Sequence, residues 1–120
     1  MATEAAETTL PGPFKHWRLE TDLDGIVWLY IDRDGEKVNS LSRDVLNELG
    51  RIVDHLENHP PTGLVLTSGK PGTFIVGADV REFDQTRDVT LLQEGVREVH
   101  ALFDRIEKLG FPKVVAFEGF

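Results

Sequence analysis

The sequence predicts an α/β domain, and three features support that class. Two short runs rich in β-branched and aromatic residues, Ile26–Ile31 and Gly63–Ser68, are typical of strands. Between them, apolar residues recur at helical spacing from Val45 to Leu56. A third apolar run, Lys113–Phe117, follows a second segment with helical spacing. The resulting order is β-β-α-β-α-β, with a short helical segment before the second long helix.

Turn and capping residues set the expected bounds. The sequence DLDG after Thr21 is typical of a turn, so the first two strands are predicted to form an antiparallel hairpin. Ser42 is the expected N-cap of the first helix, and either Asp88 or Thr90 that of the second. The elements are expected at these places: strands near 17–21, 26–32, 63–68 and 113–118, and helices near 42–57 and 90–108.

Both helices show an apolar stripe. The continuous run Ile26–Ile31 predicts a strand buried on both faces. The first helix is expected to bury Leu46, Leu49, Val53 and Leu56 against the sheet. The stripe of the second helix comprises Leu92, Val96, Val99, Phe103 and Ile106.

Composition excludes several functional classes. The 120 residues suffice for one small domain, which we place at 16–120 after a flexible leader at 1–15. A net charge of −8 argues against general binding of nucleic acid or of anionic membranes. Without cysteine there is no disulfide, cysteine nucleophile or cysteine metal site. No apolar run approaches the ~18 residues that a membrane span requires, and the leader lacks a secretory signal.

The stretch that carries the most chemistry is GKPGTFIVGADVREF, Gly69–Phe83. Gly77 permits unusual backbone angles, and Asp79 is a suitable N-cap for a helix beginning at Val80. This arrangement leaves the N–H of Ala78 bare beside a helix N-terminus, where it would stabilise negative charge. A plain strand-to-helix connection explains the same glycines. A P-loop does not, because Ala78-Asp79 stand where its Lys-Ser/Thr pair belongs.

Four stretches in order resemble the crotonase superfamily of enoyl-CoA hydratases and isomerases. They read IVWLYIDRD, KVNSLSRDVLNEL, GLVLTSGKPGTFIVGADVREF and FPKVVAFEGF. The DxxGEKVNSL loop at Asp32–Leu41 is most similar to the hydratase region of multifunctional fatty-acid-oxidation α subunits. The resemblance implies a crotonase-like spiral of ββα turns, incomplete here because the chain stops near residue 120. We therefore expect the N-terminal part of a longer protein.

The resemblance also implies a site. Ala78 would supply the first of two backbone N–H groups that bind the thioester oxygen of an acyl-CoA. The glycine-rich turn that holds the second N–H, and the two catalytic glutamates, would follow Phe120. Val76 is larger than the residue common at its position, which would narrow the acyl tunnel. Residues expected to contact acyl-CoA are Lys37, Val38, Asn39, Ser40, Val76, Gly77, Ala78, Asp79 and Val80.

The function implied is hydration of 2-enoyl-CoA thioesters in fatty acid β-oxidation, in the cytoplasm. We expect no tightly bound cofactor, with NAD required only if a dehydrogenase domain follows. The parent protein is expected to be oligomeric, with a thiolase β subunit as a possible partner, and the chain alone is expected to be inactive and poorly folded or self-associating. Alternatives are an enoyl-CoA isomerase, a non-catalytic crotonase-fold scaffold protein and, from the residues alone, a doubly wound nucleotide-binding domain.

Other candidate residues have simpler interpretations. Glu118 stands near the expected site but upstream of the family's catalytic glutamates. Asp79 is better explained as a helix cap than as a base. His55 and His59 are four residues apart, but Pro60 ends the helix there, which disfavours a zinc pair. Trp28 is expected on a sheet face.

Overall fold

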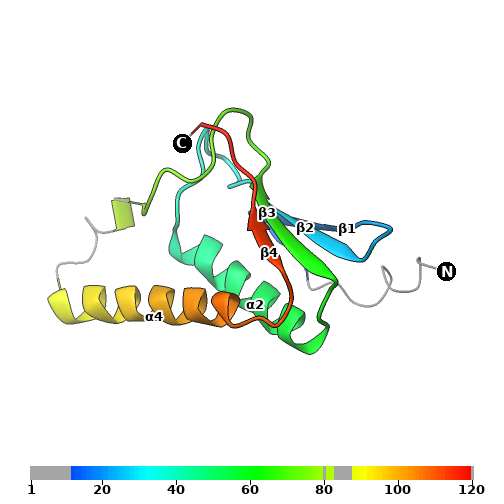
Figure 1. Ribbon diagram of the computed structural model, residues 1–120. Helices are drawn as coiled ribbons and strands as arrows, with labels where there is room; N and C mark the ends of the chain where they lie inside the picture. The colour runs from blue at the N-terminus through cyan, green and yellow to red at the C-terminus, as the bar shows by residue number, and fades with distance from the viewer. Residues whose placement is uncertain (1–11, 80, 83–87, 120) are drawn as a thin grey trace.

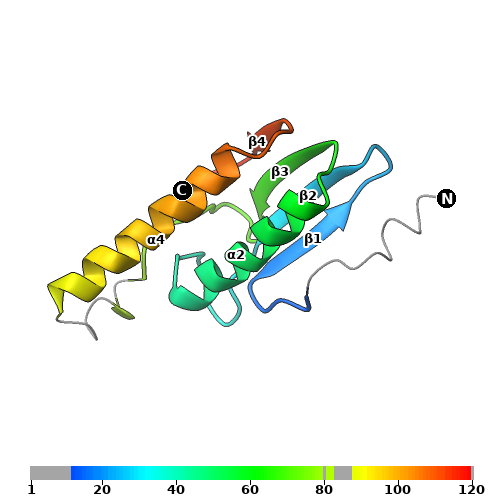
Figure 2. The same ribbon diagram turned by 90° about the horizontal axis from the view of Figure 1, so that it is seen from below.

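The computed structural model describes residues 12–79, 81–82 and 88–119. It contains one sheet of four strands in the order β1-β2-β3-β4. Two long helices cover one face of this sheet, and the other face is open (Figures 1 and 2). The elements are β1 Trp17–Thr21, β2 Ile26–Ile31, α2 Arg43–Asn58, β3 Gly63–Ser68, α4 Val89–Glu107 and β4 Lys113–Val115.

The strand pairing follows the connections. β1 and β2 form the predicted antiparallel hairpin, in which Trp17 pairs with Ile31 and Thr21 with Val27. β2 and β3 are parallel and are connected through α2, and β3 and β4 are parallel and are connected through α4. Consequently the carboxyl ends of three parallel strands meet at one edge of the sheet.

The helix bounds agree with the predictions to within one residue. The hydroxyl of Ser42 accepts a hydrogen bond from Val45 N, which confirms Ser42 as the N-cap of α2. The second helix is capped by Asp88, whose carboxylate accepts from the backbone N–H groups of Thr90 and Leu91. Arg105 of α4 pairs with Asp54 and Glu57 of α2, which holds the two helices together.

The core lies between the sheet and α2. Leu49, Val53 and Leu56 are buried as predicted, whereas Leu46 is only partly buried. The strands contribute alternate residues to the same core, because successive side chains of a strand point to opposite faces. Its fully enclosed apolar residues are Ile31, Val45, Ile52, Val53 and Leu56.

Two expectations, on the burial of β2 and on the length of β4, are wrong, and the apolar stripe of α4 has little cover. β2 is not buried on both faces, because its residues alternate and Trp28 and Tyr30 lie half-buried on the open face. The predicted stripe of α4 is largely uncovered, with Val96 and Phe103 exposed, because only the last turns of α4 pack on the core, through Leu102. β4 ends at Val115 instead of residue 118: its pairing with β3 stops at Leu66, before β3 itself ends at Ser68. Beyond Val115 the chain lies against the loop that follows β3, where the ring of Phe117 stacks on that of Phe74.

The end of the segment predicted as a leader packs on the fold. Residues 1–11 lie outside the described part of the chain, but Phe14 packs against the core and under the guanidinium of Arg51. The backbone N–H groups of Lys15 and His16 both donate to the carboxylate of Glu48 on α2. Contacts with the core and with α2 therefore begin before β1.

Candidate active site

Three chain segments meet at the carboxyl edge of the parallel strands (Figure 1). The loop at 32–41 follows β2, the loop at 69–79 follows β3, and residues 116–119 follow β4. The ring of Phe74 stacks on that of Phe117, with centroids 5.6 Å apart. Gly119 approaches so closely that a Cβ there would overlap Gly72 O, and its φ of +74° also favours glycine. The edge is thus one assembled surface.

A short backbone ladder joins the first two loops beside Ala78. Val76 N donates to Asn39 O at 2.9 Å, Leu41 N to Gly77 O at 2.8 Å, and Asp79 N to Leu41 O at 3.2 Å. Leu41 and Ala78 therefore form a parallel bridge in which Leu41 bonds to both neighbours of Ala78. In such a bridge the N–H of the bracketed residue points to the opposite side.

The N–H of Ala78 consequently points away from Leu41. Within the described residues nothing accepts a hydrogen bond from it, and Ala78 is exposed. The preceding Gly77 has a φ of +129°, which a residue with a side chain rarely adopts. A free backbone donor at an exposed turn is available to a ligand oxygen.

Asn39 holds the two loops and two strands together from inside. Its side chain is fully buried, and its Oδ1 accepts from Arg33 N at 2.8 Å. Its Nδ2 group contacts three acceptors: Ile31 O at 3.1 Å, Ser68 Oγ at 3.0 Å and Phe74 O at 2.9 Å. These contacts consume the hydrogen-bonding capacity of the amide, so Asn39 shapes the site and has no exposed side-chain atom to offer a ligand.

Asp79, the residue after Ala78, is buried and forms ion pairs with two arginines. Its carboxylate pairs with Arg33 Nη1 at 2.9 Å and with Arg81 Nε at 3.1 Å, and its side chain is 6% exposed. Arg81 N donates to Asp79 Oδ1 at 3.0 Å, so Asp79 does cap the helical turn at Arg81 and Glu82. Hydrogen bonds from Arg81, followed by that from Arg33, lower the pKa of Asp79 to about 2. An acid this strong is a poor general base near neutral pH, which supports the predicted role as a cap.

The lowered pKa of Asp79 predicts how the turn responds to acid. Because the folded pKa is below the ordinary value of 3.8, the ion pairs stabilise the folded state fully above that value and lose this contribution as pH falls toward 2. We expect the carboxyl carbon of Asp79 to titrate near pH 2 in carbon-13 NMR, and near its ordinary value after Arg33→Met and Arg81→Met together. A wild-type midpoint near 4 would contradict the assignment.

Comparisons with known proteins identify the relatives of this chain. No family model matches it. It is 37% identical over 106 residues to the fatty acid oxidation complex subunit alpha of Idiomarina loihiensis, an alignment that covers 88% of this chain and 15% of the relative. The chain thus resembles fatty acid oxidation complex alpha subunits over most of its own length.

Solved structures agree on the crotonase fold. The enoyl-CoA hydratase of Bacillus anthracis matches with a TM-score of 0.77 at 22% identity, over 87% of this chain and 40% of that protein. Pseudomonas aeruginosa DspI matches with a TM-score of 0.78 at 22% identity, over 93% of this chain and 44% of that protein. The chain thus spans 15% of the length of the curated relative and less than half of each solved structure.

The structure brings together most residues that the crotonase resemblance indicated. Lys37, Val38, Val76 and Ala78 are exposed around the backbone ladder, with Gly77 partly buried. Ser40 is buried and its hydroxyl accepts from Arg33, so its side chain, like that of Asn39, faces inward. Val80 lies outside the described residues.

Sequence reasoning missed Arg33. It stands in a loop with charges of both signs, DRDGEK, where nothing separates a buried arginine from a solvated one. Lys70 was missed for the same reason, although its Nζ crosses between the loops to Asp32 Oδ1 at 2.7 Å and Arg33 O at 2.8 Å. Only the folded arrangement reveals these contacts.

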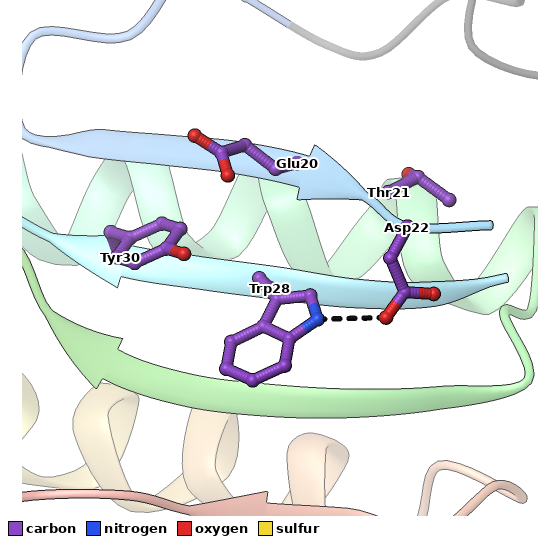
Figure 3. Close-up of a pocket in the computed structure, with 5 residues that line it drawn as sticks. All are labelled: Glu20, Thr21, Asp22, Trp28 and Tyr30. Atoms are coloured by element: carbon purple, nitrogen blue, oxygen red, sulfur yellow. Dashed lines mark hydrogen bonds between the residues drawn. The ribbon is translucent and has the colours of Figure 1, made fainter. Parts of the chain in front are cut away.

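A separate hollow lies on the open face of the sheet, and its polar side chains contact one another. It encloses about 250 Å³ near the hairpin turn (Figure 3). That turn precedes β2, whereas the loop that contacts Ala78 follows it. Trp28 Nε1 donates to Asp22 Oδ2 at 3.0 Å there, and this bond is the main cause that lowers the pKa of Asp22. Arg18 lies 4.1 Å from the ring centroid of Tyr30. Since these groups satisfy one another, the hollow is not our candidate site.

Neither a metal site nor a membrane span is found among the described residues. No group of three or more histidine and acidic side chains there could hold a metal ion, and none of the helices there has the length and hydropathy that a membrane span requires. The rings of His55 and His59 stack with centroids 4.6 Å apart.

Proposed function

We propose that this chain forms the acyl-CoA-binding part of an enoyl-CoA hydratase, and that Ala78 N–H binds the thioester oxygen. The main support is the parallel bridge, which leaves this N–H without a partner among the described residues, at the exposed Ala78. When water adds to a 2-enoyl thioester, negative charge develops on the carbonyl oxygen. A donor fixed in advance stabilises that charge more than it stabilises the substrate, and so accelerates the reaction.

The rest of the proposed site surrounds this donor. The exposed side chains of Val38 and Val76 would contact the acyl-pantetheine portion, and Lys37 would meet a phosphate of CoA. Asp79 would contribute through the turn that it caps. The second donor and the catalytic glutamates are proposed to come from sequence beyond Phe120, as in the family.

The proposed setting follows from the names of the relatives. Several curated relatives are fatty acid oxidation complex alpha subunits, which supports a role in β-oxidation within an oligomer. A thiolase β subunit as partner, a cytoplasmic location, and NAD use by a following dehydrogenase domain belong to this proposal. A CoA thioester is the proposed substrate, without a tightly bound cofactor.

The test is hydration of crotonyl-CoA by the complete protein that carries this chain, followed as loss of the conjugated enoyl-thioester absorbance. We expect conversion to 3-hydroxybutyryl-CoA, and none with free crotonate as the control. Migration of the double bond in a 3-enoyl-CoA without hydration would favour an isomerase instead. Binding of acyl-CoA without either reaction would favour a non-catalytic scaffold.

A further inference from the structure

One ion pair differs from the others in the described part of the chain. Arg33 and Asp79 have side chains that are 12% and 6% exposed. In every other ion pair described, at least one partner is a third or more exposed, as with Arg105, at 39%. Exposed pairs contribute little to stability, and buried pairs are weak evidence for it, because removing two charges from water is costly. We therefore look for a role of this buried pair other than stabilising the fold.

The pair joins the loop at 32–41 to the loop at 69–79, which contains the Ala78 N–H donor. Arg33 is anchored in the first loop, where its backbone N–H donates to Asn39 Oδ1 and its guanidinium contacts Ser40 Oγ. Asp79 is anchored in the second loop, where its backbone N–H donates to Leu41 O. Arg33 thus reaches the residue that directly follows Ala78.

The Ala78 N–H needs this support on the side of Asp79. On its other side stands Gly77, where a Cβ would meet nothing within 4 Å and where φ is +129°. Glycine restricts backbone rotation less than any other residue, so Gly77 itself does little to fix the orientation of the peptide that carries the Ala78 N–H. Two hydrogen bonds with the backbone of Leu41, one to Gly77 O and one from Asp79 N, limit how far this peptide can tilt. The ion pair with Arg33 holds the side chain of Asp79, and so supports the second of these hydrogen bonds.

We propose that Arg33 is a positioning residue, which acts through Asp79 to hold the Ala78 N–H in the direction of the thioester oxygen. This inference rests on the proposed function and deepens it. Because the pair is internally neutralised, it adds no net charge to the site; its effect is on geometry. A small displacement of a preorganised donor weakens transition-state binding more than ground-state binding.

The experiment compares variants of the complete protein. Arg33→Met removes the charge, Asp79→Asn keeps the shape and an oxygen for the cap, and Arg33→Lys restores a cation. Arg105→Gln is the matched control, since it removes an ion pair between α2 and α4 at a distance from the loops. Turnover and KM for crotonyl-CoA are measured for each variant, together with its melting temperature. All assays are run well below the lowest melting temperature among the variants.

A second readout reports the donor directly. A CoA thioester whose carbonyl is conjugated with an electron-donating aromatic ring absorbs at longer wavelength when hydrogen bonds polarise that carbonyl. A change that only loosened the fold would lower the melting temperature without altering this shift in the remaining folded protein. If Arg33→Met fails to fold, Asp79→Asn and Arg33→Lys still complete the test.

We expect Arg33→Met and Asp79→Asn to lower kcat by about 10- to 100-fold with little change in KM, and to reduce the red shift of the bound chromophore. Arg33→Lys should recover part of both, and Arg105→Gln should retain both. Unchanged kcat and red shift in Arg33→Met and Asp79→Asn would overturn the inference. A wild-type protein with neither hydration nor red shift would instead overturn the proposed function itself.

Discussion

Replacing Ala78 with proline in the complete protein should lower the turnover of crotonyl-CoA by about 10²–10³-fold, the usual effect of losing one oxyanion donor. Proline lacks the N–H, and in this structure that N–H has no partner among the described residues whose loss would confuse the result. The loss corresponds to ~2.7–4 kcal/mol of transition-state stabilisation. It is measured as kcat and kcat/KM by steady-state kinetics.

The control for this experiment is Ala78→Gly, which keeps the donor and adds only flexibility. It should retain most of the activity, while both variants should melt within a few degrees of the wild type because Ala78 is exposed. Near-normal turnover in Ala78→Pro would show that this N–H does not bind the thioester oxygen.

Asn39→Ala should cause the largest loss of stability, about 3 kcal/mol or more in the free energy of unfolding. The side chain is fully buried, and its removal leaves Arg33 N and Phe74 O without the amide that pairs with them. Ile31 O loses one donor but still accepts from Gly69 N. Each buried group left unsatisfied costs ~1–3 kcal/mol. Urea denaturation of the complete protein, followed by circular dichroism, measures the change.

Asn47→Ala is the matched control. Asn47 lies exposed on α2, where alanine is the better helix former, so the midpoint of denaturation should stay or rise slightly. If Asn39→Ala were as stable as Asn47→Ala, water or a rearranged loop would have to replace the amide contacts.

Local signals in the sequence predicted most of the elements. Ile26–Ile31 and Gly63–Ser68 are strands because their β-branched and aromatic side chains suit a pleated surface. Ser42 and Asp88 begin helices because a short polar side chain can accept from the first N–H groups. These properties depend on neighbouring residues only, so they can be predicted from the sequence.

Burial was predicted less well because it depends on what lies across the sheet. The apolar run of β2 suggested two covered faces, but α2 and α4 lie on the same side (Figure 2). The stripe of α4 has helical spacing, yet Val96 and Phe103 are exposed because the first turns of that helix project beyond the sheet (Figure 1). Periodicity identifies an apolar side of a helix but not the surface that covers it.

The strands, the helices and the glycine turn at Gly77 could be predicted from the amino acids alone, because each depends on residues close together in the chain. Which polar groups are used could be seen only in the folded protein. There Leu41 lies beside Ala78, whose N–H has no partner among the described residues, Asn39 is buried between both loops, and Arg33 pairs with Asp79. Those contacts arise where parallel strands bring distant loops to one edge, and no local pattern records which loops will meet there.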